Sequence, residues 1–153
     1  NHEAMMLDYL SDGDWNLWQM NGGVQTLESY SVGADGQIPG AHKEFLQNTV
    51  VYHETDKFFF VHAGLKPHLS IAENKKKHGE DVFLWERSHL QAPNLAWEKT
   101  VICGHTPQPQ PIDRPNLICI DTGCVFASRF GQGSLTAVHL PEREWVSVSC
   151  IDA

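Results

Sequence analysis

Histidines beside glycines, each placed after an apolar run, are the residues of this sequence best suited to chemistry. One lies in His62-Ala63-Gly64 and another in Gly104-His105. Glycine lets the backbone approach closely, so a neighbouring histidine can be presented into a cleft, and functional groups concentrate on such loops. Asp121 follows a third apolar run, and Asn1-His2 precedes a predicted helix. These residues form a possible ligand set of imidazoles, an amide and a carboxylate.

Nitrogen and oxygen donors in this mixture suit manganese, iron or zinc better than calcium. None of the four cysteines forms a C-x-x-C pair, so the sequence does not favour a thiolate zinc site. Each residue also has a simpler interpretation. A single histidine at a strand end can be a hydrogen-bonded packing residue, Asn1 is a good helix N-cap type, Asp121 can cap a turn, and Arg87 can be a surface cation.

The elements that must position these residues follow from the apolar pattern. The run Phe58–Val61 predicts a strand buried on both faces. Further strands are predicted over 50–55, 100–103 and 117–120, with a hairpin of 134–140 and 144–151. Helices are predicted over 3–10, 25–30, 41–48 and 81–86, with a break at Gly33–Gly36. Residues 70–78 are expected to be polar and exposed, and 108–115 irregular. Helices before a strand-rich half indicate an α/β or α+β fold.

Composition narrows the function classes. The chain has 153 residues, the length of one domain, with 11 Lys and Arg against 19 Asp and Glu and a net charge of −8. This acidic balance argues against nucleic acid as a partner, because such binding needs positive charge. No apolar run approaches the roughly 20 residues of a membrane span, and the polar start is unlike a secretory signal. We therefore expect a cytoplasmic protein with no membrane partner.

An ordered set of motifs resembles the calcineurin-like metallophosphoesterases. Asn1-His2-Glu3, His62–Pro67 and Gly104–Pro107 occur in that family's order and approximate spacing. The resemblance extends over essentially the whole chain and is greatest to the bacterial phosphoprotein-phosphatase branch, which includes Ser/Thr phosphatases and diadenosine tetraphosphate hydrolases. Further segments that resemble this branch are Ala4–Tyr9, Asn21-Gly22-Gly23, Leu84-Trp85-Glu86-Arg87 and Ile120–Gly123.

The resemblance implies a role for each matched residue. The family hydrolyses phosphate esters by in-line attack of a hydroxide held by two metal ions. Asn1, His62 and His105 then correspond to ligands of the second metal, and Asn1 also to a substrate contact. His2 corresponds to the general acid that protonates the leaving oxygen. Arg87 corresponds to the phosphate clamp, a catalytic and substrate-binding role that suits a guanidinium.

The same resemblance sets the expected function. We expect a metal-dependent phosphoesterase, foremost a Ser/Thr-type protein phosphatase, with two divalent ions in the complete enzyme: manganese first, iron or zinc as alternatives. Its partner is a phosphorylated substrate, either a phosphoprotein or a nucleotide. The alternative within the class is a dinucleoside polyphosphate hydrolase. The alternative of another class is a non-catalytic interaction module.

Two earlier motifs of the family, Gly-Asp-x-His-Gly and Gly-Asp-x-x-Asp-Arg-Gly, are not found in these 153 residues. They supply the first metal site, the bridging carboxylate and a second phosphate-binding arginine. We therefore expect a calcineurin-like β-sandwich flanked by helices and incomplete at its N-terminal side, with 1–153 as the C-terminal portion of a single metallophosphoesterase domain. Alone, the chain is expected to be inactive.

Overall fold

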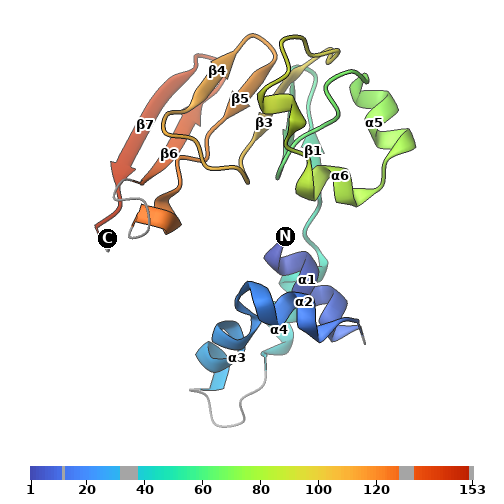
Figure 1. The fold of residues 1–153 in the computed structure, drawn as a ribbon, viewed down its shortest axis with the longest axis vertical. Coiled ribbons are helices and arrows are strands. Elements are labelled where there is room, and N and C mark those ends of the chain that lie inside the picture. The colour runs from blue at the N-terminus through green and yellow to red at the C-terminus, as the bar shows by residue number, and fades with distance from the viewer. Residues whose placement is uncertain (12, 32–37, 128–132, 152–153) are drawn as a thin grey trace. The chain divides into compact units, whose positions relative to one another are not determined.

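The chain divides into two compact units in a computed structural model that describes residues 1–11, 13–31, 38–127 and 133–151. The first unit comprises Asn1–Val50 and the second Val51–Ala153. The predicted break at Gly33–Gly36 lies outside the described residues. Figure 1 shows that the first unit is helical and that the strands belong to the second.

The first unit is built from four α-helices and one π-helical turn among its described residues. Its core is aromatic and sulfur-rich, with Met5, Met6 and Trp18 buried. Trp18 is fully buried because the rings of Tyr9 and Trp15 lie against it, at 5.1 and 5.6 Å between centroids. The elements are α1 (His2–Leu10), α2 (Trp15–Trp18), η1 (Gln19–Gly23), α3 (Val24–Ser31) and α4 (Gly40–Gln47).

The helices predicted near 3–10, 25–30 and 41–48 are thus confirmed as α1, α3 and α4. Helix α2 was not predicted, because Asp14 and Asn16 indicated only a break. The Asp14 side chain instead caps this helix by accepting from the Asn16 backbone N–H at 2.8 Å. Asn21-Gly22-Gly23 ends η1 and directly precedes α3. Gly22 makes the kink there with φ of 101°, a conformation that favours glycine.

A five-stranded mixed sheet forms the centre of the second unit. Its order is β1-β2-β3-β5-β4. The three inner strands β2, β3 and β5 are parallel, and the edge strands β1 and β4 are antiparallel to their neighbours. The bounds are β1 (Tyr52–Glu54), β2 (Phe58–Val61), β3 (Thr100–Cys103), β4 (Ile112–Arg114) and β5 (Leu117–Cys119).

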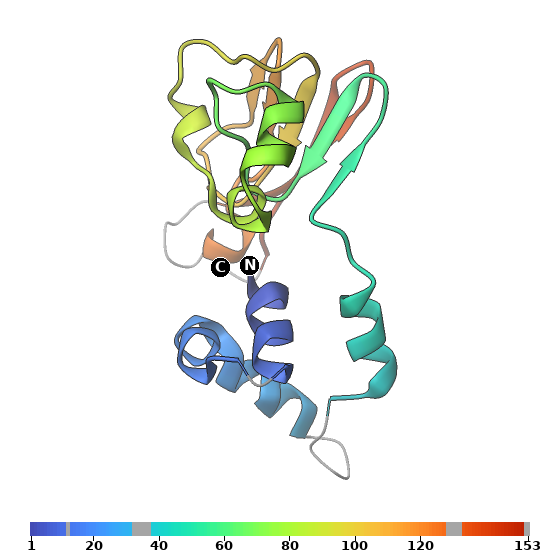
Figure 2. The ribbon, with the colours of Figure 1, turned by 90° about the vertical axis from the view of Figure 1, so that its right-hand side faces the viewer.

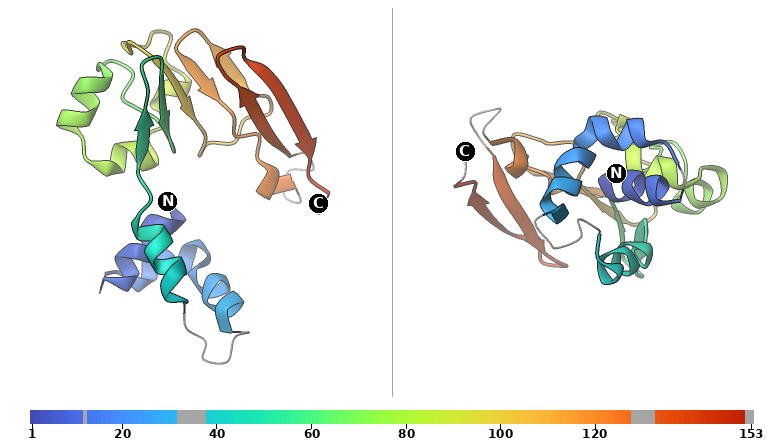
Figure 3. Two further views of the ribbon diagram at one scale, coloured as in Figure 1. Left: turned by 180° about the vertical axis from the view of Figure 1, so that it is seen from behind. Right: turned by 90° about the horizontal axis from the view of Figure 1, so that it is seen from below.

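A two-stranded hairpin, β6 (Ser134–His139) with β7 (Glu144–Ser149), lies on the β4–β5 side of this sheet (Figure 3). A bridge from Thr122 to Ser134 follows β5 and leads into it. The hairpin was predicted, and its pairing is confirmed. Arg143 in its turn forms an ion pair with Asp113 of β4. The turn η3 (Cys124–Phe126) lies between β5 and β6.

Two short helices cover one face of the larger sheet, α5 (Ile71–Lys77) and α6 (Glu80–Trp85) (Figure 2). Ile71 and Phe83 from these helices share one core cluster with Phe59, Val101 and Leu117 of the sheet. Helix α6 matches the prediction over 81–86. The 3-10 turn η2 (Ser88–Leu90) follows it.

Two sequence-based expectations were wrong and one was incomplete. The polar stretch 70–78 was expected to be exposed, and Lys75–Lys77 are; the stretch also contains helix α5, which begins at a capping box of Ser70 and Glu73 and buries Ile71 and Asn74. Residues 108–115 contain strand β4, which pairs with β5 despite the flanking prolines. Strand β2 was predicted to be buried on both faces, but its residues alternate between half-buried and buried. In β5, by contrast, all three residues are buried.

The fold class is therefore confirmed: a mixed α/β arrangement with a five-stranded sheet flanked by helices, consistent with the calcineurin-like fold that the resemblance implies. Among the described residues, no helix combines the length and apolarity that crossing a bilayer requires.

Candidate active site

The carboxyl ends of the three parallel strands bring together the loops predicted to carry chemistry. His62 follows β2 and His105 follows β3 after one glycine. The two loops are joined because the Gly104 backbone N–H donates to the His62 carbonyl at 2.9 Å. Asp121 follows β5 by way of Ile120, whose N–H donates to the Cys103 carbonyl at 3.0 Å. Parallel strands end at the same sheet edge, which is where ligands bind in open α/β sheets.

His62 and His105 meet through ring nitrogens. His62 Nε2 lies 3.1 Å from His105 Nδ1, with the ring centroids 4.9 Å apart. Two nitrogens bound to one transition metal at roughly 2.0–2.1 Å sit at about this separation. The pair therefore fits two ligands of one ion. Among the residues that the structure describes, no group of three or more His, Cys, Asp and Glu gathers for a metal.

His105 has a backbone conformation that side-chain-bearing residues rarely adopt. Its φ is 66°, in the left-handed region. The Thr106 N–H donates to the Gly104 carbonyl at 2.7 Å, which closes the turn around this residue. Such strain costs on the order of 1 kcal/mol and clusters at functional sites. The turn thus holds the imidazole at the sheet edge at an energetic cost.

Arg87, the third predicted site residue in this unit, lies against the same histidine. Its Nε and Nη2 atoms are 3.1 and 2.9 Å from His105 Nε2. A guanidinium only donates, so His105 Nε2 accepts and His105 Nδ1 carries the proton toward His62. Burial, and then the positive charge of Arg87, lowers the pKa of His105 to about 4. His105 is therefore neutral at pH 7.

His105 cannot bind a cation through Nδ1 and accept a hydrogen bond from Arg87 at Nε2 at the same time. Binding a cation through Nδ1 requires a lone pair on Nδ1, so the proton must lie on Nε2. Nε2 can then no longer accept from Arg87. A cation at the His62–His105 pair would therefore free the guanidinium for another acceptor, such as a phosphate oxygen.

Glu86 fixes the backbone on which Arg87 stands. Its buried carboxylate accepts from the N–H groups of Arg87 and Ser88 at 3.1 and 2.7 Å and forms an ion pair with Lys66. Burial opposes ionisation, but hydrogen bonds from Lys66 and Ser88 outweigh it and lower the pKa of Glu86 to about 2. The carboxylate is thus charged at neutral pH and braces the arginine.

His89 is a buried residue that ties the three segments together. It lies two positions after Arg87, and its Nε2 is 3.6 Å from the sulfur of Cys103, two positions before His105. A Cβ at Gly64, two positions after His62, would come within 2.1 Å of the His89 ring. Only glycine therefore leaves room for this imidazole.

Burial lowers the pKa of His89 to about 4, so the ring is neutral at pH 7. Its Nδ1 is buried and has no hydrogen-bond partner among the described residues.

An open pocket of about 400 Å³ borders the arginine. Trp85 lines this pocket, and its indole is perpendicular to the His105 imidazole, 5.7 Å between centroids. Its lining residues are Lys66, Asp81, Val82, Trp85, Glu86, Arg87 and Ser88.

Asp121 takes the turn-capping alternative. Its Oδ1 accepts from the Gly123 N–H at 2.9 Å, and its carbonyl accepts from the Gln108 N–H at 2.9 Å. The lysines at 75–77 end α5, where Lys75 and Lys77 form ion pairs with Glu54 and Glu73.

Asn1 and His2 lie in the first unit, so their meeting with His62, Arg87 and His105 stays a prediction. Asn1 occupies the N-cap position of α1, yet its side chain makes no capping hydrogen bond in the described structure. His2 Nε2 accepts from the Trp18 indole N–H at 3.1 Å and lies 3.4 Å from Thr26 Oγ1. An indole only donates, so neutral His2 holds its proton on Nδ1 in this arrangement.

Sequence reasoning did not single out Glu86, His89 or Lys66 as site residues. Glu86 and Lys66 stand inside motifs that were quoted for the resemblance. His89 had no signal, because its partners Gly64 and Cys103 are distant in the sequence.

Among known proteins, the chain is similar to bis(5'-nucleosyl)-tetraphosphatases. The chain is 30% identical over 149 residues to the asymmetrical bis(5'-nucleosyl)-tetraphosphatase PrpE of Geobacillus sp., and 30% over 125 residues to that of Halalkalibacterium halodurans. It is 41% identical over 62 residues to a symmetrical bis(5'-nucleosyl)-tetraphosphatase of Bordetella pertussis.

These matches cover 87%, 73% and 40% of the chain. They span only 58%, 48% and 21% of the respective relatives. No protein-family model matches the chain.

Proposed function

We propose that this chain forms part of the active site of a phosphoesterase that hydrolyses bis(5'-nucleosyl) tetraphosphates. The observation that supports it most is the convergence of His62, His105 and Arg87 at one sheet edge. His62 Nε2 lies 3.1 Å from His105 Nδ1, and Arg87 Nη2 lies 2.9 Å from His105 Nε2. The names of the relatives favour this substrate over the phosphoprotein that the sequence first suggested.

His62 and His105 would hold one divalent cation, with Asn1 as a third ligand and substrate contact. The cation, manganese or else iron or zinc, supplies charge neutralisation and an acidified water when bound. Arg87 binds two oxygens of the attacked phosphate through parallel donors. In the family that the chain resembles, a second ion is held by two motifs that are not found in these 153 residues.

The reaction adds water across a phosphoanhydride. The water oxygen forms a bond to phosphorus and gives up one proton to solvent, the bridging P–O bond breaks, and the leaving phosphate retains the bridging oxygen. His2 donates a proton to that oxygen in this proposal. Glu86 acts indirectly, because it holds the Arg87 backbone.

Turnover by the complete protein that contains this chain tests the proposal. Diadenosine tetraphosphate and a phosphoserine peptide are compared by kcat/KM, with products separated by anion exchange. We expect the tetraphosphate to be the better substrate. Arg87→Ala should reduce its kcat/KM by about 10²-fold, the order expected for a lost charge-stabilising contact, and Arg87→Lys should recover only part of it.

Arg143→Ala is the matched control, because it removes an arginine from the hairpin turn. It should leave kcat/KM unchanged. Faster hydrolysis of the phosphopeptide would favour the protein phosphatase alternative. Equal effects of Arg87→Ala and Arg143→Ala would contradict the assigned site.

A further inference from the structure

Trp85 is a large aromatic side chain left open to water beside the candidate site. It is 43% exposed, although it ends the helix α6 whose Phe83, two residues earlier, is buried in the core. Its ring lies perpendicular to the His105 ring, with an interplanar angle of 88°. The contact with His105 thus leaves much of the Trp85 surface available for a ligand.

The segment that carries Trp85 is braced. Glu86 follows it directly, and its carboxylate holds the next two backbone N–H groups at 3.1 and 2.7 Å. The indole and the Arg87 guanidinium therefore stand two residues apart on a fixed piece of backbone. Rigid placement lowers the entropy lost when a ligand binds both groups.

The pocket beside them combines apolar and charged surface. Trp85 and Val82 contribute apolar walls, Arg87 and Lys66 contribute cations, and Asp81 and Glu86 contribute carboxylates, of which Glu86 is paired with Lys66. Lys66 is paired with Glu86, whereas among the described residues the Arg87 guanidinium bonds the neutral imidazole of His105. A volume of about 400 Å³ is at the lower end of ordinary ligand pockets. It suits one flat ring system beside one phosphate group.

We propose that Trp85 is a nucleobase platform, on which a nucleoside polyphosphate stacks its base while Arg87 binds its phosphate. This subsite rests on the proposed function and specifies how a nucleotide, rather than any phosphate ester, is recognised. Stacking on an indole uses the flat face that every base has, so the subsite binds purines and pyrimidines without reading their edges.

Two probes of similar charge separate base recognition from phosphate recognition: ATP and inorganic tripolyphosphate. Each is titrated into the full 153-residue chain in metal-free buffer and followed by NMR of the indole N–H groups. We expect ATP to bind about tenfold more tightly than tripolyphosphate, the order of one base–aromatic stack. ATP should shift the Trp85 indole N–H resonance. This resonance is assigned as the one that is missing from the spectrum of Trp85→Leu.

Trp85→Leu keeps an apolar side chain against His105 but removes the flat ring. It should weaken ATP binding about tenfold and change tripolyphosphate binding by less than twofold. The matched control is Trp145→Leu, which removes a half-buried indole from β7. It should change neither affinity.

Equal affinities for the two probes, or a Trp85→Leu variant that binds ATP as tightly as the original chain, would overturn the nucleobase platform. The proposed function is tested separately by Arg87→Ala. If tripolyphosphate binding is lost in Arg87→Ala while Trp85→Leu has no effect, the phosphate site stands and the platform fails. A chain that binds neither probe contradicts both.

Discussion

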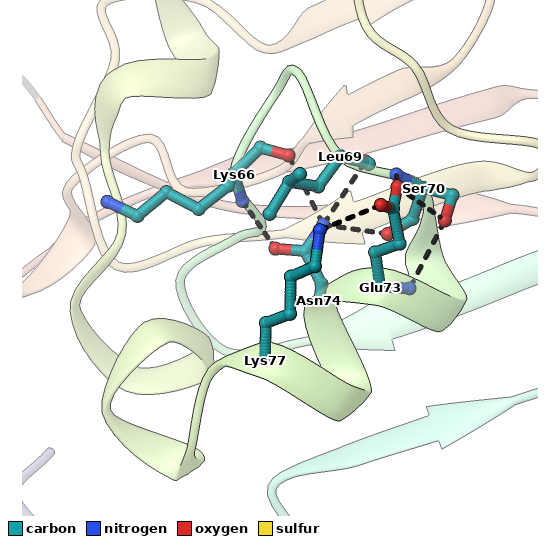
Figure 4. Close-up of polar contacts among 6 residues, drawn as sticks. All are labelled: Lys66, Leu69, Ser70, Glu73, Asn74 and Lys77. Atoms are coloured by element: carbon teal, nitrogen blue, oxygen red, sulfur yellow. Dashed lines mark hydrogen bonds and ion pairs between the residues drawn. The ribbon is translucent and has the colours of Figure 1, made fainter.

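Two polar regions of the second unit satisfy their hydrogen-bonding groups in opposite ways. Around α5, the buried polar side chain Asn74 is bonded to nearby backbone. Asn74 is fully buried, accepts from the Lys66 N–H at 2.8 Å and donates to the carbonyls of Lys66, Leu69 and Ser70 (Figure 4). Ser70 and Glu73 complete the capping box. These bonds satisfy buried groups within one short stretch of chain, which stabilises the fold.

At the sheet edge, side chains bond instead to one another. Arg87 bonds His105, and His105 bonds His62, through contacts that a cation or phosphate could replace. The turn at His105 is strained and His89 Nδ1 is left unpaired among the described residues. In this unit, hydrogen bonds to nearby backbone thus stabilise the fold. Side-chain contacts that a ligand could replace, next to a strained turn, indicate a binding site.

The largest effect that would test this contrast is expected at Asn74. Asn74→Ala should lower the free energy of unfolding by about 3 kcal/mol, because buried backbone groups lose their partner. Urea denaturation measures it. Lys76→Ala, an exposed position on the same helix, should change stability by less than about 0.5 kcal/mol. Equal stability of the two variants would show that the Asn74 bonds do not matter.

A second effect is expected from the pH dependence of stability at His89. Its folded pKa of about 4 lies below the 6.5 of an ordinary histidine. Between these values the unfolded chain binds more protons, so stability is complete above pH 6.5 and falls as the pH drops toward 4.

His89→Gln cannot titrate. The original chain should therefore lose on the order of 2 kcal/mol more than this variant between pH 7 and pH 4.5. Urea denaturation at both pH values gives the difference. Parallel profiles for the two proteins would mean that the buried imidazole is not the titrating group.

The smallest effect concerns strain at His105. Ordinarily glycine destabilises a protein relative to alanine. At a φ of 66° the order should reverse, and His105→Gly should be about 1 kcal/mol more stable than His105→Ala. Both variants lack the imidazole, so thermal unfolding of the pair isolates the backbone term. A more stable alanine variant would remove strain from the description of the site.

Much of this contrast could be predicted from sequence where the signal is local. The apolar runs predicted strands β2, β3 and β5. Because His62 and His105 follow two of these runs, they were expected in loops at the strand ends. Helix α5 was missed although its capping-box spacing at Ser70 and Glu73 was readable. Glu86 and His89 could not be assigned, since their roles depend on contacts between distant segments that periodicity does not encode.

Manganese binding by the 153-residue chain tests the central claim most directly, that His62 and His105 form one cation site. Calorimetric titration should show one weakly bound ion per chain, and the His62→Ala/His105→Ala double variant should show none. His53→Ala/His68→Ala is the matched control and should bind as the original does. The chain should not turn over p-nitrophenyl phosphate. Binding unchanged in the site variant, or two ions with turnover, would contradict the account.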